Sequence, residues 1–167
     1  MQQRKLGQLG TSVSAVGYGA MSFTDFYGPA TEEGSEAILK RCIDLGITHI
    51  DTSNAYGLGK SENRIGAFLA KQGKQAQDFF KIATKAGITR DADGKRKFDN
   101  SPKHLRDSLD ASLERLGVEH LDLLQIHWPD RYVPLFGSTR YNVRDERADV
   151  VSFEEQARAM AELVKSG

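Results

Sequence analysis

Residues 47–57 read Ile-Thr-His-Ile-Asp-Thr-Ser-Asn-Ala-Tyr-Gly, a segment in which apolar residues give way to polar ones. The apolar part predicts a β-strand over residues 47–52. The stretch before it predicts a helix, because two acids follow Thr31, where a helix N-terminus favours negative charge, and Gly46 suits the C-terminal end. A helix that leads directly into such a strand indicates a repeating β–α unit.

The same alternation continues in both directions from this segment. Apolar runs predict further strands over 13–16, 79–84 and 121–126, and helical periodicity predicts helices over 61–72, over 101–117 and from Ser152 onward. The resulting order, βαβαβαβα, has the spacing of parallel strands joined by crossover helices. Two architectures are built in this way, the open doubly wound sheet and the (β/α)₈ barrel. A barrel needs eight strands and typically ~250 residues, so four strands would form half of one.

The composition restricts the classes of function. The 167 residues include 23 basic and 23 acidic side chains, so the formal net charge is zero. A neutral chain lacks the positive field that gathers nucleic-acid phosphates or an anionic membrane, and we expect neither partner. The single cysteine, Cys42, excludes an internal disulfide and a cysteine-based zinc site. No apolar run reaches the ~20 residues of a membrane span, and no signal-peptide pattern is present. We therefore expect a cytoplasmic protein without a metal site.

Polar side chains stand where three of the predicted strands end. Asp51 and Tyr56 follow the second strand, Lys85 follows the third and His127 follows the fourth. In both architectures the carboxyl ends of parallel strands meet at one edge, where chemistry collects. Taken singly, these residues have structural explanations: a turn-capping aspartate, a rim tyrosine, a solvated lysine and a core histidine. Together they predict a single site.

These four residue types predict a specific chemistry. A nearby ammonium favours the ionised form of a tyrosine hydroxyl, and a buried ammonium needs a carboxylate partner. Lys85 and Asp51 would supply these two charges beside Tyr56. His127 would orient a carbonyl oxygen or help to relay its proton. The set predicts a general acid for carbonyl reduction, a form of catalysis commonly worth ~10²–10⁴-fold in rate.

These residues belong to motifs through which the whole sequence resembles the aldo-keto reductase family. The resemblance is greatest to its bacterial branch with a long loop after strand four. The resemblance rests on motifs that occur in the family's order: Gly17-Tyr18-Gly19-Ala20-Met21, Asp51-Thr52-Ser53-x-x-Tyr56-Gly57, Ser61-Glu62 with Gly66, Ala83-Thr84-Lys85, and residues 121–129, Leu-Asp-Leu-Leu-Gln-Ile-His-Trp-Pro.

The resemblance implies an α/β fold of the (β/α)₈ TIM-barrel type. Residues 1–167 would form a single domain that holds only the N-terminal half of this barrel, with four βα units. A short β-hairpin over residues 1–13 would precede them, and the long loop after strand four would span residues 129–152.

The resemblance also implies an activity, the transfer of a hydride from NADPH to a small aldehyde or ketone. Tyr56 would donate the proton, and Lys85 and Asp51 would adjust the acidity of its hydroxyl. His127 would help to bind the carbonyl oxygen. The expected cofactor-binding positions, at the nicotinamide and its ribose, are Ala20, Met21, Asp51 and His127.

The resemblance stops after the fourth helix. Phosphate sites of such barrels commonly come from loops after strands seven and eight, which this sequence does not include. Three explanations stand open: a truncated chain, a half-barrel that pairs with another copy, or a second half supplied separately. The alternative function is a non-catalytic half-barrel scaffold or interaction module that self-associates through its open sheet edges.

Three other features receive weaker interpretations. The segment from Asn54 to Ser61 lacks the first glycine of a phosphate-binding P-loop, and Gly17-x-Gly19 lacks the third glycine of a dinucleotide fingerprint. The charged stretch over residues 140–149 is explained either by a solvated loop or by a lid over the mouth of the site.

Overall fold

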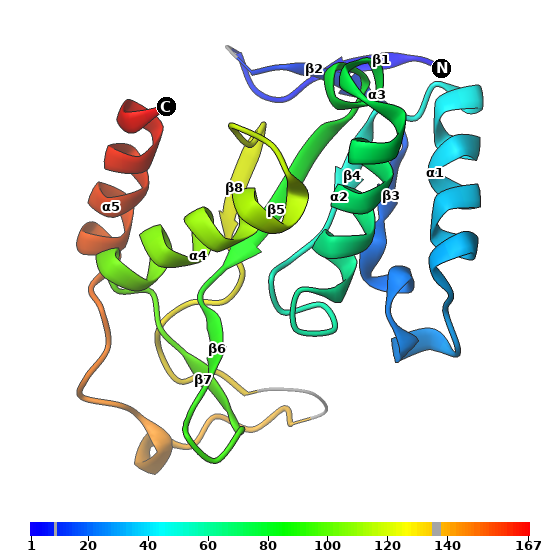
Figure 1. Ribbon diagram of the computed structural model, residues 1–167. Coiled ribbons are helices and arrows are strands. Elements are labelled where there is room, and N and C mark those ends of the chain that lie inside the picture. Colours follow the sequence, from blue (N-terminus) through cyan, green and yellow to red (C-terminus); the bar gives the residue numbers. More distant parts are fainter. Residues whose placement is uncertain (9, 135–137) are drawn as a thin grey trace.

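The computed structural model describes residues 1–8, 10–134 and 138–167, and a sheet of four parallel strands forms its centre (Figure 1). The strands lie in the order β3 (Gly17–Gly19), β4 (His49–Asp51), β5 (Lys81–Ala86) and β8 (Leu123–Ile126). In the register of this sheet Gly19 lies opposite Asp51, and Lys85 lies opposite Gln125. The carboxyl ends of neighbouring strands therefore come together at one edge of the sheet.

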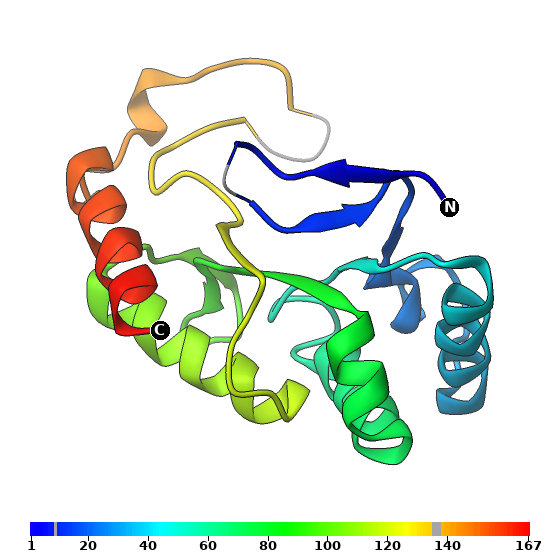
Figure 2. The same cartoon turned by 90° about the horizontal axis from the view of Figure 1, so that it is seen from above.

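Helices cover one face of this sheet (Figures 1 and 2). They are α1 (Glu32–Leu45), α2 (Lys60–Gln72), α4 (Pro102–Leu116) and α5 (Phe153–Ser166). The hydroxyl groups of Thr31, Ser101 and Ser152 cap three of them by accepting a backbone N–H from the first turn. α1 and α4 end at Gly46 and Gly117, both in the left-handed conformation that glycine adopts without steric cost.

Smaller elements complete the chain. Two antiparallel hairpins are present, one of β1 (Gln3–Lys5) and β2 (Ser12–Ser14) and one of β6 (Ile88–Arg90) and β7 (Arg96–Phe98). Figure 1 shows them at opposite ends of the central sheet. The remaining elements are α3 (Lys74–Phe79) and the 3₁₀ turns η1 (Ala20–Phe23), η2 (Asp25–Tyr27) and η3 (Val143–Asp145). The predicted loop over residues 129–152 includes η3, and its residues 135–137 lie outside the described residues, as does residue 9 of the predicted hairpin.

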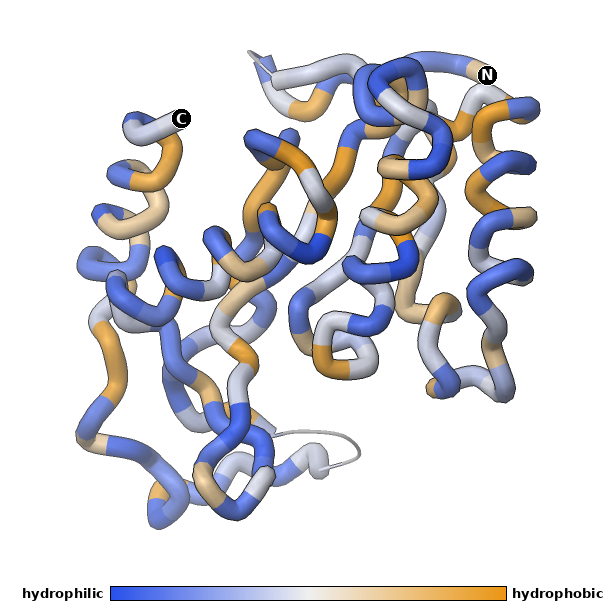
Figure 3. Tube along the Cα trace, in the orientation of Figure 1, coloured by the Kyte–Doolittle hydropathy of each residue, from blue (hydrophilic) through white to orange (hydrophobic). Residues whose placement is uncertain are grey.

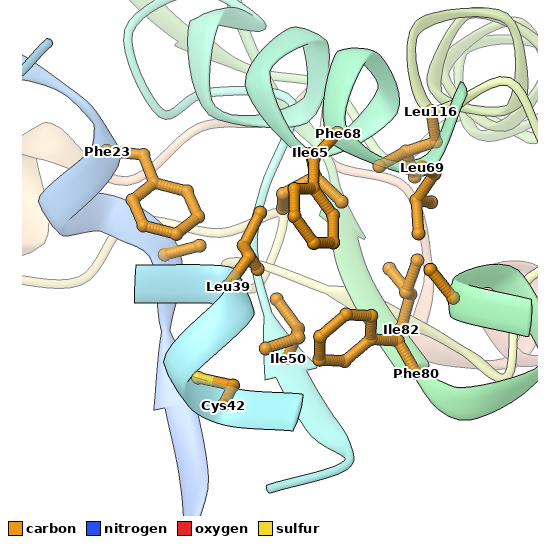
Figure 4. Close-up of a cluster of buried hydrophobic side chains, with 12 residues drawn as sticks. Phe23, Leu39, Cys42, Ile50, Ile65, Phe68, Leu69, Phe80, Ile82 and Leu116 are labelled. Atoms are coloured by element: carbon orange, nitrogen blue, oxygen red, sulfur yellow. The ribbon is translucent and has the colours of Figure 1, made fainter. Parts of the chain in front are cut away.

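The main hydrophobic core lies between the sheet and the helices (Figure 4). Leu39 of α1, Ile50 of β4 and Ile65 of α2 are fully buried, and Phe80 closes the cluster beside β5. Burying one such side chain contributes about 1.5–3 kcal/mol, so this cluster fixes the helices against the strands. Figure 3 shows hydrophobic residues along the strands, whereas the β6–β7 hairpin is mostly hydrophilic.

The first sheet strand differs from the sequence prediction. The apolar run over 13–16 predicted that strand, but β2 ends at Ser14 and belongs to the hairpin, while β3 begins at Gly17. A side chain at position 17 would place its Cβ 2.8 Å from Cδ2 of His49. Glycine therefore permits the close approach of β3 to β4, a requirement that hydrophobic patterning does not reveal.

The segment before the third sheet strand also differs from its prediction. The strand predicted over 79–84 begins instead at Lys81, and the preceding residues form α3. An ion pair between Lys74 and Asp78, one turn apart, supports this helix. Phe80 is buried by tertiary packing rather than by a strand, so its hydrophobicity was a misleading signal. The β6–β7 hairpin was not predicted from the sequence.

No helix within the described ranges is both long enough and apolar enough to cross a membrane.

Close contact between α2 and α4 generates a prediction about stability. A Cβ atom at Gly66 would lie 2.1 Å from the backbone oxygen of Arg115. We expect Gly66→Ala to lower the free energy of unfolding by about 1–3 kcal/mol, because the overlap with a backbone atom outweighs the helix-favouring effect of alanine. Thermal denaturation followed by circular dichroism measures this change.

Gly34→Ala in α1 is the matched control, since its Cβ would meet only the Thr31 hydroxyl at 3.2 Å. A Gly66→Ala protein as stable as the parent would contradict the packing argument.

Candidate active site

The ammonium group of Lys85 connects two of the predicted site residues. Its Nζ donates to the Asp51 carboxylate, to the backbone oxygen of Thr52 at 2.8 Å and to the Tyr56 hydroxyl at 3.3 Å. The lysine side chain is only 14% exposed and that of Asp51 is 35% exposed. A cation removed from water to this extent requires such partners, and the carboxylate balances its charge.

Tyr56 occupies a tight turn between β4 and α2. Its backbone N–H donates to the backbone oxygen of Ser53 at 3.1 Å, and its backbone oxygen accepts the N–H of Ser61 at 3.3 Å. Two residues later Leu58 has a φ of 55°, a left-handed conformation that is uncommon outside glycine. This turn returns the chain into α2 and leaves the tyrosine half-buried, with its hydroxyl at the ammonium of Lys85.

His127 lies directly after β8 and faces Tyr56. The two ring centroids are 5.6 Å apart and the rings are nearly perpendicular, at 86°. Burial, and to a lesser extent the nearby Lys85 cation, lower the pKa of His127 to about 4, against the opposing effect of Asp51. The imidazole is therefore neutral at neutral pH.

The structure brings the four predicted residues Asp51, Tyr56, Lys85 and His127 to one end of the sheet. The two further cofactor candidates lie differently. Ala20 is fully buried, and its backbone oxygen accepts the Ser61 hydroxyl at 2.8 Å, whereas Met21 is half-buried. Of these two, only Met21 presents side-chain surface to a ligand.

Two residues of the site were missed by the sequence reasoning. The Ser53 hydroxyl lies 2.9 Å from Nδ1 of His127, and Nε2 of Gln125 donates to the Asp51 carboxylate at 3.2 Å. A signal for Gln125 existed, because residues two apart on a strand share a face and His127 follows at that spacing. Ser53 carried no such signal, since its partner is 74 residues away in the chain.

This arrangement suits proton donation to an oxygen atom of a ligand. Where the Ser53 hydroxyl donates to Nδ1, the neutral imidazole of His127 carries its proton on Nε2 and can donate from there. The Tyr56 hydroxyl is a second donor, and the Lys85 ammonium stabilises the negative charge that remains after proton transfer. Two donors beside a partly buried cation form a site for an oxygen that gains negative charge during a reaction.

The sequence profile of the Aldo/keto reductase family matches residues 15–167. Among curated proteins, the chain is 37% identical over 125 residues to aldo-keto reductase yakc of Schizosaccharomyces pombe, whose name specifies NADP(+). It is 36% identical over 127 residues to an L-galactose dehydrogenase of Arabidopsis thaliana. The aligned parts cover 74% and 76% of this chain, but 36% and 38% of those relatives.

Among solved structures, the chain is similar to the holo form of an aldo-keto reductase from Bacillus halodurans, with a TM-score of 0.74 and 27% sequence identity. The match covers 100% of this chain and 47% of that one. This likeness confirms the predicted barrel-type fold, and this chain spans about half the length of the matched structure.

The burial of His127 near the Lys85 cation generates a prediction about its titration. Its folded pKa of about 4 lies below the ordinary 6.5, so its protonation opposes folding as the pH falls from about 6.5 to about 4. We expect NMR to show no titration of this ring between pH 5 and 8. In Lys85→Met the pKa of His127 should rise, because a repelling cation is lost.

Lys81→Met, at the other end of β5, is the control and should leave the pKa of His127 unchanged. A ring that titrates near 6.5 in the parent protein would contradict the assignment.

Proposed function

The chain belongs to the aldo/keto reductase family, and we propose that its site reduces the carbonyl group of a small aldehyde or ketone with NADPH as the hydride donor. The observation that carries this proposal is the hydrogen bonding of Lys85, whose ammonium contacts both the Asp51 carboxylate and the Tyr56 hydroxyl. The named relatives support the same class of reaction, since they are a reductase and a dehydrogenase.

The chemistry of the strand ends fits a nicotinamide cofactor. Met21, Asp51 and His127 are partly exposed at the ends of three strands, and a carboxylate such as that of Asp51 accepts hydrogen bonds from ribose hydroxyls. We propose that these three residues contact the cofactor. We propose that Ala20, whose side chain is buried, contributes by anchoring the backbone next to Met21. When bound, NADPH supplies a hydride to the carbonyl carbon.

Tyr56 donates the proton in the proposed reaction. As the carbonyl carbon gains a hydride, its oxygen gains negative charge and takes the phenolic proton to become an alcohol. The phenolate left on Tyr56 is stabilised by the Lys85 ammonium, and Asp51 keeps that ammonium in place. A proton from water then restores the phenol.

His127 orients the carbonyl oxygen in this proposal. Because its imidazole is neutral, it offers a hydrogen bond without adding a second positive charge beside Lys85. Its ring lies 5.6 Å from the Tyr56 ring, centroid to centroid, so the two proposed donors belong to neighbouring side chains. An oxygen held there lies within reach of the tyrosine proton.

The length of the chain bears on which assembly performs the reaction. The chain covers 36–38% of the two curated relatives, and barrels of this type commonly bind phosphate through the loops after strands seven and eight. Within the described part of the sheet, β3 and β8 each pair with one strand only, so each has a free edge. We propose that the active form is an assembly in which these edges are paired, by another copy or by a second segment.

The same free edges favour one alternative function, a non-catalytic half-barrel that self-associates and binds no cofactor. Cofactor binding separates the two functions. The charged stretch over 140–149 is almost entirely exposed, and both interpretations of it, solvated loop and lid, remain predictions, as does the cytoplasmic location.

Titration of the purified chain with NADPH tests the proposal directly. Trp128 is the single tryptophan and follows His127, so we expect saturable quenching of its fluorescence as the cofactor binds. Sedimentation of the same sample reports whether binding accompanies self-association. No saturation at any practical cofactor concentration would favour the non-catalytic alternative for this chain.

Removal of the phenolic hydroxyl tests the assignment of the proton donor. In a preparation that reduces aldehydes, Tyr56→Phe should lower kcat by about 10²-fold or more, because the general acid is lost, while NADPH still binds. Tyr141→Phe is the matched control, since that tyrosine is exposed and its hydroxyl donates to Glu146 in the long loop. Full activity in Tyr56→Phe would refute the role of Tyr56.

A further inference from the structure

A fully buried carboxylate lies behind the site, on the side of the sheet that faces the helices. Glu62, in the first turn of α2, has no exposed surface. Its Oε1 accepts the Thr84 hydroxyl of β5 at 2.6 Å, and its Oε2 accepts Nε of Arg115 of α4 at 2.6 Å. One side chain thus joins a helix start, a sheet strand and the last turn of a second helix.

Stability alone does not account for a charge in this place. Removing a carboxylate and a guanidinium from water costs several kcal/mol for each ion, and apolar side chains of similar volume are often equally stable or more stable. What the ion pair adds over apolar packing is direction, because each oxygen of Glu62 accepts one defined donor. The ion pair therefore fixes the positions of Thr84 and Arg115 relative to α2.

The first oxygen of Glu62 acts on the strand that carries Lys85. Successive side chains of a strand point to opposite faces, so Thr84 faces the helices while Lys85 faces the site. The bond from Thr84 to Glu62 holds β5 at the residue immediately before the lysine. Any rotation or slip of the strand end that moves the ammonium away from Tyr56 must break this buried bond.

The second oxygen of Glu62 acts, through Arg115, on the turn that carries Tyr56. Gly59, three residues after the tyrosine, lies against the Arg115 side chain so closely that a Cβ there would be 2.7 Å from Cδ of the arginine. With its guanidinium held by Glu62, Arg115 forms a fixed surface beneath this turn. The Lys85 strand and the Tyr56 turn are therefore both set by the same carboxylate.

The neighbouring residue Ser61 provides a parallel connection. Its hydroxyl accepts from the Thr52 hydroxyl at 2.9 Å and donates to the backbone oxygen of Ala20 at 2.8 Å. Thr52 is also the residue whose backbone oxygen accepts the Lys85 ammonium. Two successive residues of α2 thus hold the ends of β3, β4 and β5, the three strands that lead to the proposed cofactor and proton-donor positions.

We propose that Glu62 is a positioning residue for the proton-transfer pair: through Thr84 it sets the place of Lys85, and through Arg115 it sets the turn of Tyr56. This inference rests on the proposed reductase function for its catalytic meaning. The contact between Lys85 and Tyr56 that it explains can be measured by NMR independently of turnover, so it can be tested separately.

The test compares two substitutions at Thr84 in the full chain. Thr84→Val keeps the shape of the side chain but loses the hydroxyl, whereas Thr84→Ser keeps the hydroxyl bonded to Glu62. Glu62→Gln is a further variant that keeps an acceptor for Thr84 but removes the charge that holds Arg115. Ser35→Ala in α1 is the control for the loss of a buried hydroxyl away from the site, since the Ser35 hydroxyl donates to the backbone oxygen of Thr31, the N-cap residue of its own helix.

The first readout is the NMR nuclear Overhauser contact between the Tyr56 ring and the Lys85 side chain, whose Nζ lies 5.0 Å from the ring centroid. We expect this contact in the parent chain, in Thr84→Ser and in Ser35→Ala, and its loss or marked weakening in Thr84→Val and Glu62→Gln. An unchanged contact in both of the latter would overturn the proposal. If Thr84→Val does not fold, Glu62→Gln decides the question alone.

The second readout is steady-state kinetics in a preparation that reduces aldehydes. Misplacement of the proton-transfer pair should lower kcat about 10- to 100-fold in Thr84→Val and leave KM within about twofold, with recovery in Thr84→Ser. Equal kcat in Thr84→Val and Thr84→Ser would overturn the positioning role while leaving the reductase function intact. If the parent protein reduces no carbonyl substrate, the proposed function fails and the NMR comparison still decides the position of the pair.

Discussion

The partly buried ammonium of Lys85 is the constraint on which the site depends. A cation at the end of a parallel sheet needs an opposite charge and further acceptors, and here these come from β4 and from the turn that follows it. The requirement links three separate features, namely the Asp51 carboxylate, the half-buried Tyr56 hydroxyl and the neutral His127 ring, whose pKa is lowered by burial and also by this cation. The chemistry proposed for the site is thus a consequence of how the fold accommodates one charge.

The two faces of the sheet have different roles at its carboxyl end. Side chains at alternate positions, such as Asp51 and Lys85, face the site, while Thr52 and Thr84 face the helices and bond to Ser61 and Glu62. Polar bonds on the helix side have a single geometry, unlike apolar contacts, which tolerate small displacements. A layer of such bonds therefore supports the side chains of the proposed site, within a sheet whose β3 and β4 have three residues each.

The free edges of β3 and β8 place this site in half of a larger architecture. The chain matches the Aldo/keto reductase family over residues 15–167 and resembles a solved member over its whole length, while it covers 47% of that member. The four residues proposed for proton donation and carbonyl binding all lie within this part of the barrel. Barrels of this type commonly bind phosphate through the loops after strands seven and eight.

The sequence alone determined the order of the four βα units, the helix starts at Thr31, Ser101 and Ser152, and the presence of four polar side chains at the strand ends. These features are local, because helix caps and hydrophobic periodicity depend on residues a few positions apart. Tertiary structure alone decided that Phe80 lies in the core before β5 begins and that β3 starts at Gly17 against the ring of His49. It also decided that Ser53 meets His127 and that Glu62 meets Arg115, pairs separated by 74 and 53 residues. Such pairs depend on strand register and on how closely α2 and α4 pack at Gly66, which no local pattern encodes.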